Sequence, residues 1–379
     1  MTKGIILCLS FIAFFFVSCK NDNYSKEKTN KIYIDLSKGD YIKPEKVFKN
    51  TTFIPLETTK SSSLGIVTKI EQKEDKLYVL DFSQSNIQVF DTTGKHHFTI
   101  DRTGRGPGEY LQMYDFNFNQ FANTLELMSP RGKVISCDLQ GENCTEIIKL
   151  PSNISAIHSF EILSEEIIAF YARHHTNRLL FYDRTKGEIV KEILPNRDPD
   201  KLIRSLPLRL SPFYRMNGQL YFLDQQGYDL SILDPGKMEL ELKYSIDFGK
   251  NNFDIASLPK ETEKDISIFN NYINENKIVF PISGFRETKQ FIKFNLSIAG
   301  QEYRTILYDK DKGTSTWLDI PPNIHRDFFP YFSLSTENED LGIILAPELT
   351  KDIFQNLVNE ESKMYKELNN PVIIRHTSW

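Results

Sequence analysis

Hydrophobic and polar residues alternate over short segments through most of this chain, and residues 77–95 show the pattern most clearly. Residues 77–81 read Leu-Tyr-Val-Leu-Asp, and residues 87–91 read Ile-Gln-Val-Phe-Asp. Aromatic and β-branched residues suit a pleated, half-buried surface. Gly94, in the turn that follows, supplies the positive φ that such turns often need. The segment is therefore predicted to be a pair of strands closed by a tight turn.

This pattern recurs along the chain. Residues 220–237 repeat it closely, and weaker copies occupy residues 125–141, 167–187 and 291–313. Each copy ends in an aspartate followed closely by glycine, and these aspartates are Asp91, Asp138, Asp183, Asp234 and Asp309. Repeats of about 40–50 residues built from short strands are typical of propeller blades. The aspartates are expected to bond backbone amides in turns, which discounts them as catalytic groups.

The repeats predict an all-β fold, a six-bladed β-propeller over residues 31–379. A short helical insertion is expected within residues 251–277, where the repeat spacing lengthens. One more helix, following Pro347, is expected to interrupt the C-terminal blade. A strand near residues 32–36 or 52–56 is predicted to complete the blade that holds residues 372–375, because this pairing would close the circle without a long free edge.

The N-terminus looks like an export signal. Residues 4–17 form an apolar run that suits a signal peptide and is too short to span a membrane. Ser18 and Cys19 then resemble a bacterial lipobox, although Phe16 stands where leucine is commonest. Residues 1–18 are thus predicted to be a lipoprotein signal peptide, and residues 19–30 a flexible tether from lipidated Cys19. The alternative is an ordinary secretory signal with an accidental cysteine.

Charge and motif content exclude several classes of protein. The net charge of -5 argues against nucleic-acid binding, which needs a basic surface. The adjacent histidines at 96–97 and 174–175 would point to opposite faces of a strand, and no zinc-binding spacing is present. No metal and no cofactor is therefore expected. No Gly-x-Ser-x-Gly elbow is present either.

Cys137 and Cys144 flank a predicted turn. Export permits a disulfide between them, but hairpin geometry is demanding. A disulfide and a pair of free thiols both remain open from the sequence.

Residues 103–110, Thr-Gly-Arg-Gly-Pro-Gly-Glu-Tyr, have no second copy in the chain. Neither a helix nor a Lys-Ser/Thr ending follows, which disfavours a nucleotide-binding loop. One interpretation is a connection between blades in which Glu109 bonds loop amides. The other is a ligand-binding loop that presents Arg102, Arg105, Glu109 and Tyr110.

Residues 53–59, 77–81, 87–91 and 104–110 together carry a family resemblance. The chain resembles the six-bladed β-propeller lipoprotein family of Bacteroides-type bacteria, which is similar to NHL-repeat propellers. The resemblance covers about residues 30–379. It implies the fold and a cell-envelope location, expected at the outer membrane, on a leaflet side that the sequence does not specify. It supplies no catalytic residue.

The expected function is non-catalytic binding of a glycan, peptide or partner protein by a lipid-anchored monomer. Loops on a rigid scaffold are where function usually resides, whereas the side chains of the blades themselves are engaged in packing. Two alternatives stay open: a hydrolase or lyase at the same propeller face, and a scaffold subunit of an outer-membrane complex.

Overall fold

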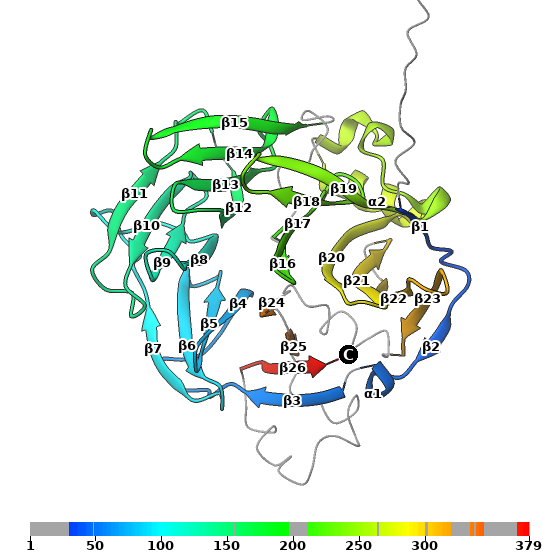
Figure 1. The fold of residues 1–379 in the computed structure, drawn as a ribbon, viewed down its shortest axis with the longest axis horizontal. Helices are drawn as coiled ribbons and strands as arrows, with labels where there is room; N and C mark the ends of the chain where they lie inside the picture. The colour runs from blue at the N-terminus through cyan, green and yellow to red at the C-terminus, as the bar shows by residue number, and fades with distance from the viewer. Residues whose placement is uncertain are drawn as a thin grey trace, which may run out of the picture.

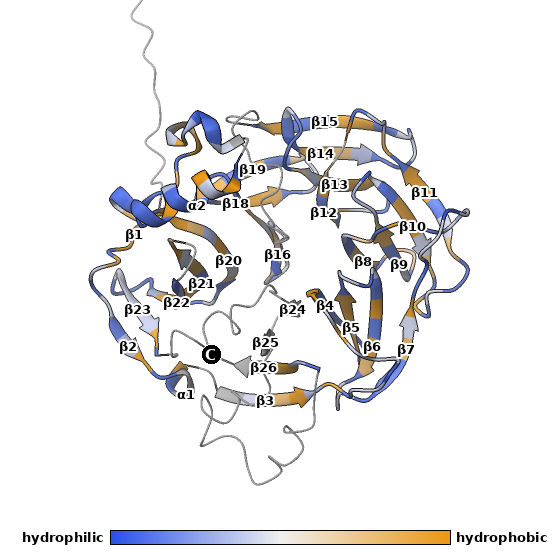
Figure 2. Cartoon of the chain, turned by 180° about the vertical axis from the view of Figure 1, so that it is seen from behind, coloured by the Kyte–Doolittle hydropathy of each residue, from blue (hydrophilic) through white to orange (hydrophobic). Residues whose placement is uncertain are grey.

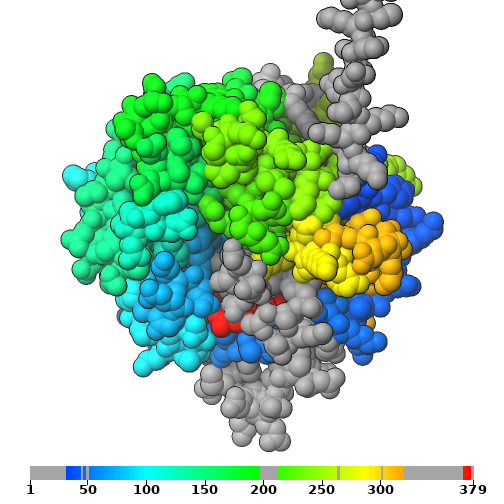
Figure 3. Space-filling model, viewed as in Figure 1, coloured from blue at the N-terminus to red at the C-terminus, as the bar shows by residue number. Residues whose placement is uncertain are grey.

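The strands form six sheets of four or five strands, which follow one another around a ring (Figure 1). The computed structural model describes residues 30–47, 49–154, 156–196, 211–263, 265–299, 302–319, 334–336, 339–344 and 370–378. In the space-filling view the sheets succeed each other in chain order around the circle (Figure 3). The prediction of an all-β, propeller-like fold is confirmed.

Three sheets are four-stranded antiparallel meanders that run from the innermost strand outward. The first holds β4 (Val67–Lys73), β5 (Lys76–Asp81), β6 (Asn86–Asp91) and β7 (His96–Ile100). The second holds β8 (Asp115–Asn119), β9 (Thr124–Met128), β10 (Lys133–Cys137) and β11 (Thr145–Lys149). The third holds β12 (Ile157–Ile162), β13 (Ile167–Ala172), β14 (Asn177–Asp183) and β15 (Glu188–Pro195).

The other three sheets each take their outermost strand from the N-terminal segment. The fourth joins β16 (Phe213–Met216), β17 (Gln219–Leu223), β18 (Asp229–Asp234) and β19 (Glu239–Asp247) to β1 (Asn30–Tyr33). The fifth joins β20 (Val279–Glu287), β21 (Phe291–Ile298), β22 (Glu302–Asp309) and β23 (Thr314–Leu318) to β2 (Asp40–Ile42). The sixth joins β24 (Leu334–Thr336), β25 (Glu339–Ile344) and β26 (Val372–Ser378) to β3 (Lys49–Pro55).

The pairing of β3 with β26 closes the ring. The two strands are antiparallel, and Ile373 lies opposite Ile54. The predicted partnership of a strand near residues 52–56 with residues 372–375 is confirmed. The sequence did not predict that β1 and β2 would add to the fourth and fifth sheets, where they pair in parallel with β19 and β23. The short helix α1 (Pro44–Val47) lies between β2 and β3 in the chain.

Trp317 holds the N-terminal segment against the fifth sheet. Its side chain is 1% exposed, and its indole Nε1 donates a hydrogen bond of 3.3 Å to the carbonyl of Lys38. A Cβ on Gly39 would lie 1.5 Å from that nitrogen, so only glycine fits. The Arg304 guanidinium lies 4.6 Å from the centroid of the Trp317 ring and donates to the hydroxyl of Tyr41 at 3.1 Å. The strand β2 is thereby fixed by stacking as well as by pairing.

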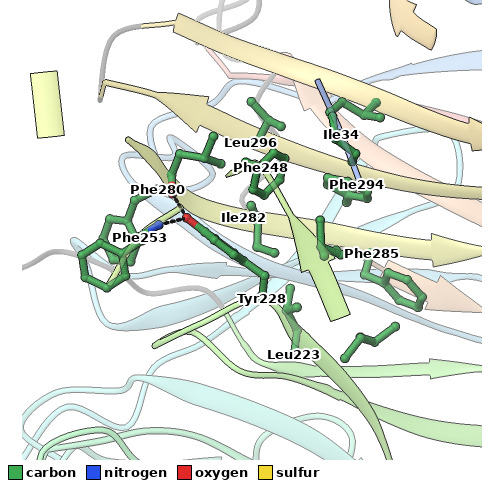
Figure 4. Close-up of a cluster of buried hydrophobic side chains, with 14 of the residues drawn as sticks. Ile34, Leu223, Tyr228, Phe248, Phe253, Phe280, Ile282, Phe285, Phe294 and Leu296 are labelled. Atoms are coloured by element: carbon green, nitrogen blue, oxygen red, sulfur yellow. Dashed lines mark hydrogen bonds between the residues drawn. The ribbon is translucent and has the colours of Figure 1, made fainter. Parts of the chain in front are cut away.

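Apolar side chains fill the spaces between neighbouring sheets, because each strand presents alternate residues to opposite faces. Figure 2 shows hydrophobic residues along the strands and hydrophilic ones in the turns. The cluster between the fourth and fifth sheets contains a buried hydroxyl on Tyr228 (Figure 4). This hydroxyl donates to the carbonyl of Val279 and accepts from the amide of Phe253, so its burial leaves no unmet hydrogen bond.

The predicted helical insertion is present. It contains the short 3₁₀ helices η1 (Gly249–Asn251), η2 (Ile255–Ser257) and η3 (Lys260–Glu263), followed by α2 (Ile266–Glu275). The Asp265 carboxylate caps α2 by accepting from the amide of Ser267 at 2.8 Å. Phe269 and Ile273 are the buried residues of α2 and pack into the same cluster as Tyr228. The helix predicted after Pro347 lies outside the described residues.

Candidate functional site

In the described part of the chain, the connections of eleven residues or more, 56–66, 101–114 and 248–278, all join strand ends on one side of the sheets. The strands that follow one another along the chain within a sheet are antiparallel, so the connection from the last of them to the next innermost strand lies at the same end as the turn between the second and third strands. We call this the loop end. Its described connections span residues 56–66, 101–114, 150–154 and 248–263 with 265–278, and the strands β15, β23 and β25 also end there. The other strand ends, which we call the turn end, are joined by connections of two to seven residues, such as 74–75 and 138–144. At the rim of the ring the turn end of one sheet adjoins the loop end of its neighbour, since Arg102 Nε donates to the carbonyl of Gly141 at 2.7 Å.

The five repeated aspartates occupy equivalent places at the turn end, between the third and fourth strands that each sheet takes in chain order from its innermost strand. Each carboxylate accepts a hydrogen bond of 2.8 to 3.1 Å from the backbone amide two residues later. This is an Asx turn, which local sequence alone can specify. The prediction that these aspartates serve the scaffold is confirmed.

The predicted ligand-binding residues lie in the connection between β7 and β8, at the loop end. Glu109 turns inward, and its Oε2 accepts from the amide of Gly106 at 2.6 Å. Tyr110 is 3% exposed, and its amide donates to the carbonyl of Arg102 at 2.9 Å. Arg102 Nε donates to the carbonyl of Gly141 at 2.7 Å. Of the four residues, Arg105 is exposed, Arg102 and Glu109 are half-buried, and Tyr110 is buried, so they do not present one exposed surface together.

Cys137 and Cys144 form a disulfide, which is one of the two alternatives that the sequence left open. The turn that it closes, residues 138–144, supports the glycine-rich connection. Gly108 lies so close to this turn that an added Cβ would be 2.3 Å from the carbonyl oxygen of Cys144. Gly108 also has a φ of +73°, which favours glycine. Two features that were separate in the sequence thus form one unit.

Ion pairs connect the innermost strands around the centre. Lys69 on β4 donates to Asp115 Oδ1 at 2.8 Å and to the carbonyl of Phe116 at 2.5 Å, both in the second sheet. The other oxygen of Asp115 accepts from the amide of Phe160 in the third sheet at 3.1 Å. Burial alone would lower the pKa of Lys69, but the charges of Asp115 and Glu71 raise it above its usual value. Lys69 is therefore a permanent cation that ties adjacent sheets.

A similar set of hydrogen bonds from a cation joins the third and fourth sheets. Arg215 on β16 donates to Glu161 Oε1 at 2.7 Å and to the carbonyl of Ile162 at 2.8 Å. In both cases a cation binds a carboxylate and the carbonyl of the next residue on the neighbouring inner strand. These ionisable groups bond one another and the backbone, which is the arrangement of a structural tie rather than of an acid–base pair.

The histidine pairs do not come together. His96 and His97 bond Gln88 and Asp91 in the first sheet, whereas His175 lies 3.5 Å from Glu192 in the third. Among the described residues, no group of three or more His, Cys, Asp or Glu side chains could hold a metal ion.

A row of aromatic and imidazole rings crosses three sheets at the loop end. The ring centroids of Phe82 and Tyr114 lie 5.3 Å apart, those of Tyr114 and His158 6.3 Å, and those of His158 and His174 5.7 Å. We call these four residues the aromatic row. Tyr114, His158 and His174 are partly exposed. No single sequence segment contains the row, so only the order of the sheets in space brings it together.

The row carries little charge and has apolar neighbours. Burial, followed by the positive charge of Arg173, lowers the pKa of His158 to about 3, so this imidazole is neutral at physiological pH. Leu111, in the connection that leads to Tyr114, is 65% exposed. Ile66 is 54% exposed, and its carbonyl accepts from the amide of Phe82 at 2.7 Å.

The model of a domain of unknown function, DUF4934, matches residues 29–377. The chain belongs to the DUF4934 family. The match spans every sheet of this DUF4934 protein but brings no activity with it. No curated protein matches the sequence.

Two solved structures from Bacteroides resemble this DUF4934 protein. One is a protein of Bacteroides fragilis NCTC 9343 that is named as an exported protein; it has 16% identity and a TM-score of 0.70, over 92% of this chain and 100% of the other. The second is a DUF4221 family member from Bacteroides vulgatus ATCC 8482, with 12% identity and a TM-score of 0.52, over 86% and 96% of the two chains. At such identities the likeness concerns the fold alone. Within the described residues, no helix is long and apolar enough to cross a membrane.

Proposed function

We propose that this DUF4934 protein is a monomeric, lipid-anchored protein of the cell envelope that binds a ligand at its loop end without catalysis. Each of the six sheets is one propeller blade, and the architecture is similar to NHL-repeat propellers. The observation that carries the proposal is the gathering of the long described connections, 56–66, 101–114 and 248–278, at the loop end. These connections differ in length and sequence and can shape a surface there, whereas the turn end offers repeated Asx turns.

The inner-strand contacts favour binding over hydrolysis or elimination. A hydrolase or lyase needs ionisable groups directed at a substrate. At the centre of the ring, Lys69 and Arg215 instead bond carboxylates and carbonyls of neighbouring strands. Removing either cation should therefore weaken the fold rather than abolish turnover.

The proposed location of the protein in the cell rests on its N-terminal sequence. We assign residues 1–18 to a lipoprotein signal peptide, Cys19 to lipid attachment, and the outer membrane to the final location. The first described residue, Asn30, already begins β1, so the tether predicted over residues 19–30 would end one residue earlier. Mass spectrometry of the full chain should find Cys19 acylated, and Cys19→Ala should move the protein from the membrane to the soluble fraction. A membrane-bound Cys19→Ala protein would refute the anchor.

Binding at the loop end is tested by capture from solubilised membranes with the soluble form that begins at residue 20. Leu111→Glu places a charge at the loop end and should abolish capture. Ile147→Glu, at a 38% exposed site on the outer strand β11, is the matched control and should not. Equal capture by both variants would place binding elsewhere, whether or not the anchor is confirmed.

A further inference from the structure

We infer that the aromatic row is the ligand-contacting surface of the loop end and that its ligand is an uncharged oligosaccharide. This inference rests on the binding function proposed above and adds the chemical class of the ligand to it.

The row combines apolar rings with a polar group at its surface, the hydroxyl of Tyr114. The rings of Tyr114, His158 and His174 are partly exposed, whereas both nitrogens of His174 and Nδ1 of His158 are buried. Aromatic side chains such as tyrosine offer an apolar body with a polar tip, and sites for small molecules combine such faces with a few placed polar groups. A sugar has the matching character, since its C–H groups form an apolar face and its hydroxyls surround the edge.

The surroundings of the row favour a neutral ligand. Exposed residues close in sequence to the row are uncharged and polar: Ser83, Gln84, Ser152, Asn153 and Thr176. The nearby ion pair of Arg178 with Asp224 is buried and joined by a second hydrogen bond, from Arg178 Nη2 to Asp224 Oδ2, at 3.1 Å. An acidic or basic ligand would find its complementary charges already paired or covered there, whereas hydroxyl groups would meet neutral donors and acceptors.

The extent of the row favours several sugar units over one. Its partly exposed rings, Tyr114, His158 and His174, come from two neighbouring sheets, and successive centroids lie 6.3 and 5.7 Å apart. Phe82, which is 7% exposed, extends the row into the first sheet as a buried ring. Ile66 and Leu111 add exposed apolar surface beside Phe82 and Tyr114. A single pyranose would cover only part of this surface, so a chain that runs along the row would bury more of it.

The experiment measures binding of the chain from residue 20 to three panels: neutral oligosaccharides, uronate-containing oligosaccharides and apolar peptides. We expect neutral oligosaccharides to bind, with longer chains binding more tightly. Tyr114→Ala should weaken binding at least tenfold, and Tyr114→Phe should retain most of it because the ring remains. Tyr33→Ala is the matched control, since Tyr33 is 60% exposed on the outer strand β1. It should leave affinity unchanged.

Three results would overturn the inference. If uronates or peptides bind and neutral oligosaccharides do not, the ligand class is wrong while loop-end binding stands. If neutral oligosaccharides bind but Tyr114→Ala and Tyr33→Ala behave alike, the row is not the surface. If no panel binds, the inference fails, and capture with the Leu111→Glu variant decides separately on the proposed function. Unchanged melting temperatures of the three tyrosine variants exclude misfolding as the cause of any loss.

Discussion

Single aspartates organise the turn end of this propeller, and Asp91 shows how. Its Oδ1 accepts from the hydroxyl of Thr93 at 2.5 Å and from the amides of Thr93 and Lys95 at 2.8 and 3.1 Å. Burial would raise the pKa of Asp91, but these bonds and one from His97 outweigh it and lower the pKa to about 2. The carboxylate is thus more acidic in the folded protein than in the unfolded chain.

The stability that Asp91 contributes should therefore depend on pH in one direction. It is fully present above the unfolded pKa of about 3.9 and is lost as pH falls through about 2. Asp91→Ala should lower stability by about 1 kcal/mol at pH 7, and the deficit should vanish near pH 2. Thermal unfolding at several pH values measures this. Thr92→Ala, in the same turn, is the control, and a deficit that is constant with pH would contradict the assignment.

Residue-scale prediction from sequence worked where the interactions are local. The Asx turns depend on an aspartate and an amide two residues away, so the repeat alone reveals them. Tyr114 and His158 gave no signal, because each is an isolated ring until the sheets bring them within 6.3 Å. Glu109 was ambiguous for a related reason: sequence cannot tell whether a carboxylate bonds its own loop or a ligand.

Among the elements, the disulfide-closed turn and the glycine-rich connection depend on each other. Cys137→Ser with Cys144→Ser should loosen residues 138–144, because the covalent closure is lost. Residues 102–110 should loosen with them, since Arg102 bonds the carbonyl of Gly141. Hydrogen exchange should then quicken in both segments and stay unchanged in β13 and β14. Faster exchange in the turn alone would show that the two segments are independent.

The strand β2 provides a second test at this scale. Gly39→Val would place side-chain atoms inside the volume of the Trp317 indole. Overpacking of this kind costs about 1–3 kcal/mol, and relief requires β2 to leave the fifth sheet. We expect a lower melting temperature and a shift in tryptophan fluorescence. Gly236→Ala is the control, because its Cβ would meet only Asp234 Oδ1, at 3.5 Å. Equal stability of the two variants would argue against the packing role.

Element prediction succeeded for strands with clear alternation and failed for β1 and β2 pairing. Alternation identifies a strand but not its partner, and a parallel partner added at an outer edge leaves no turn to reveal it. The three 3₁₀ helices before α2 could not be predicted individually from the sequence, because each is only three or four residues long.

For the molecule as a whole, the pairing of β3 with β26 predicts a cooperative ring. Deleting residues 371–379 removes β26 and leaves β3 and β25 without their common neighbour. Because every sheet packs between two others, we expect the whole domain to lose stability. Calorimetry should show a much lower melting temperature, whereas a chain that begins at residue 30 should melt normally. An unchanged transition in the deletion variant would refute closure by β26.

The path of residues 30–55 has a mechanical consequence. These residues contribute the outermost strands of three successive sheets, and four residue pairs join β1 to β19. A force on Asn30 therefore enters through β1, then meets the Trp317 contact at β2, and reaches the closing strand β3 only last. The chain has three anchorage points in series, so traction on a membrane tether would be absorbed at the rim before it could strain the surface where the row lies.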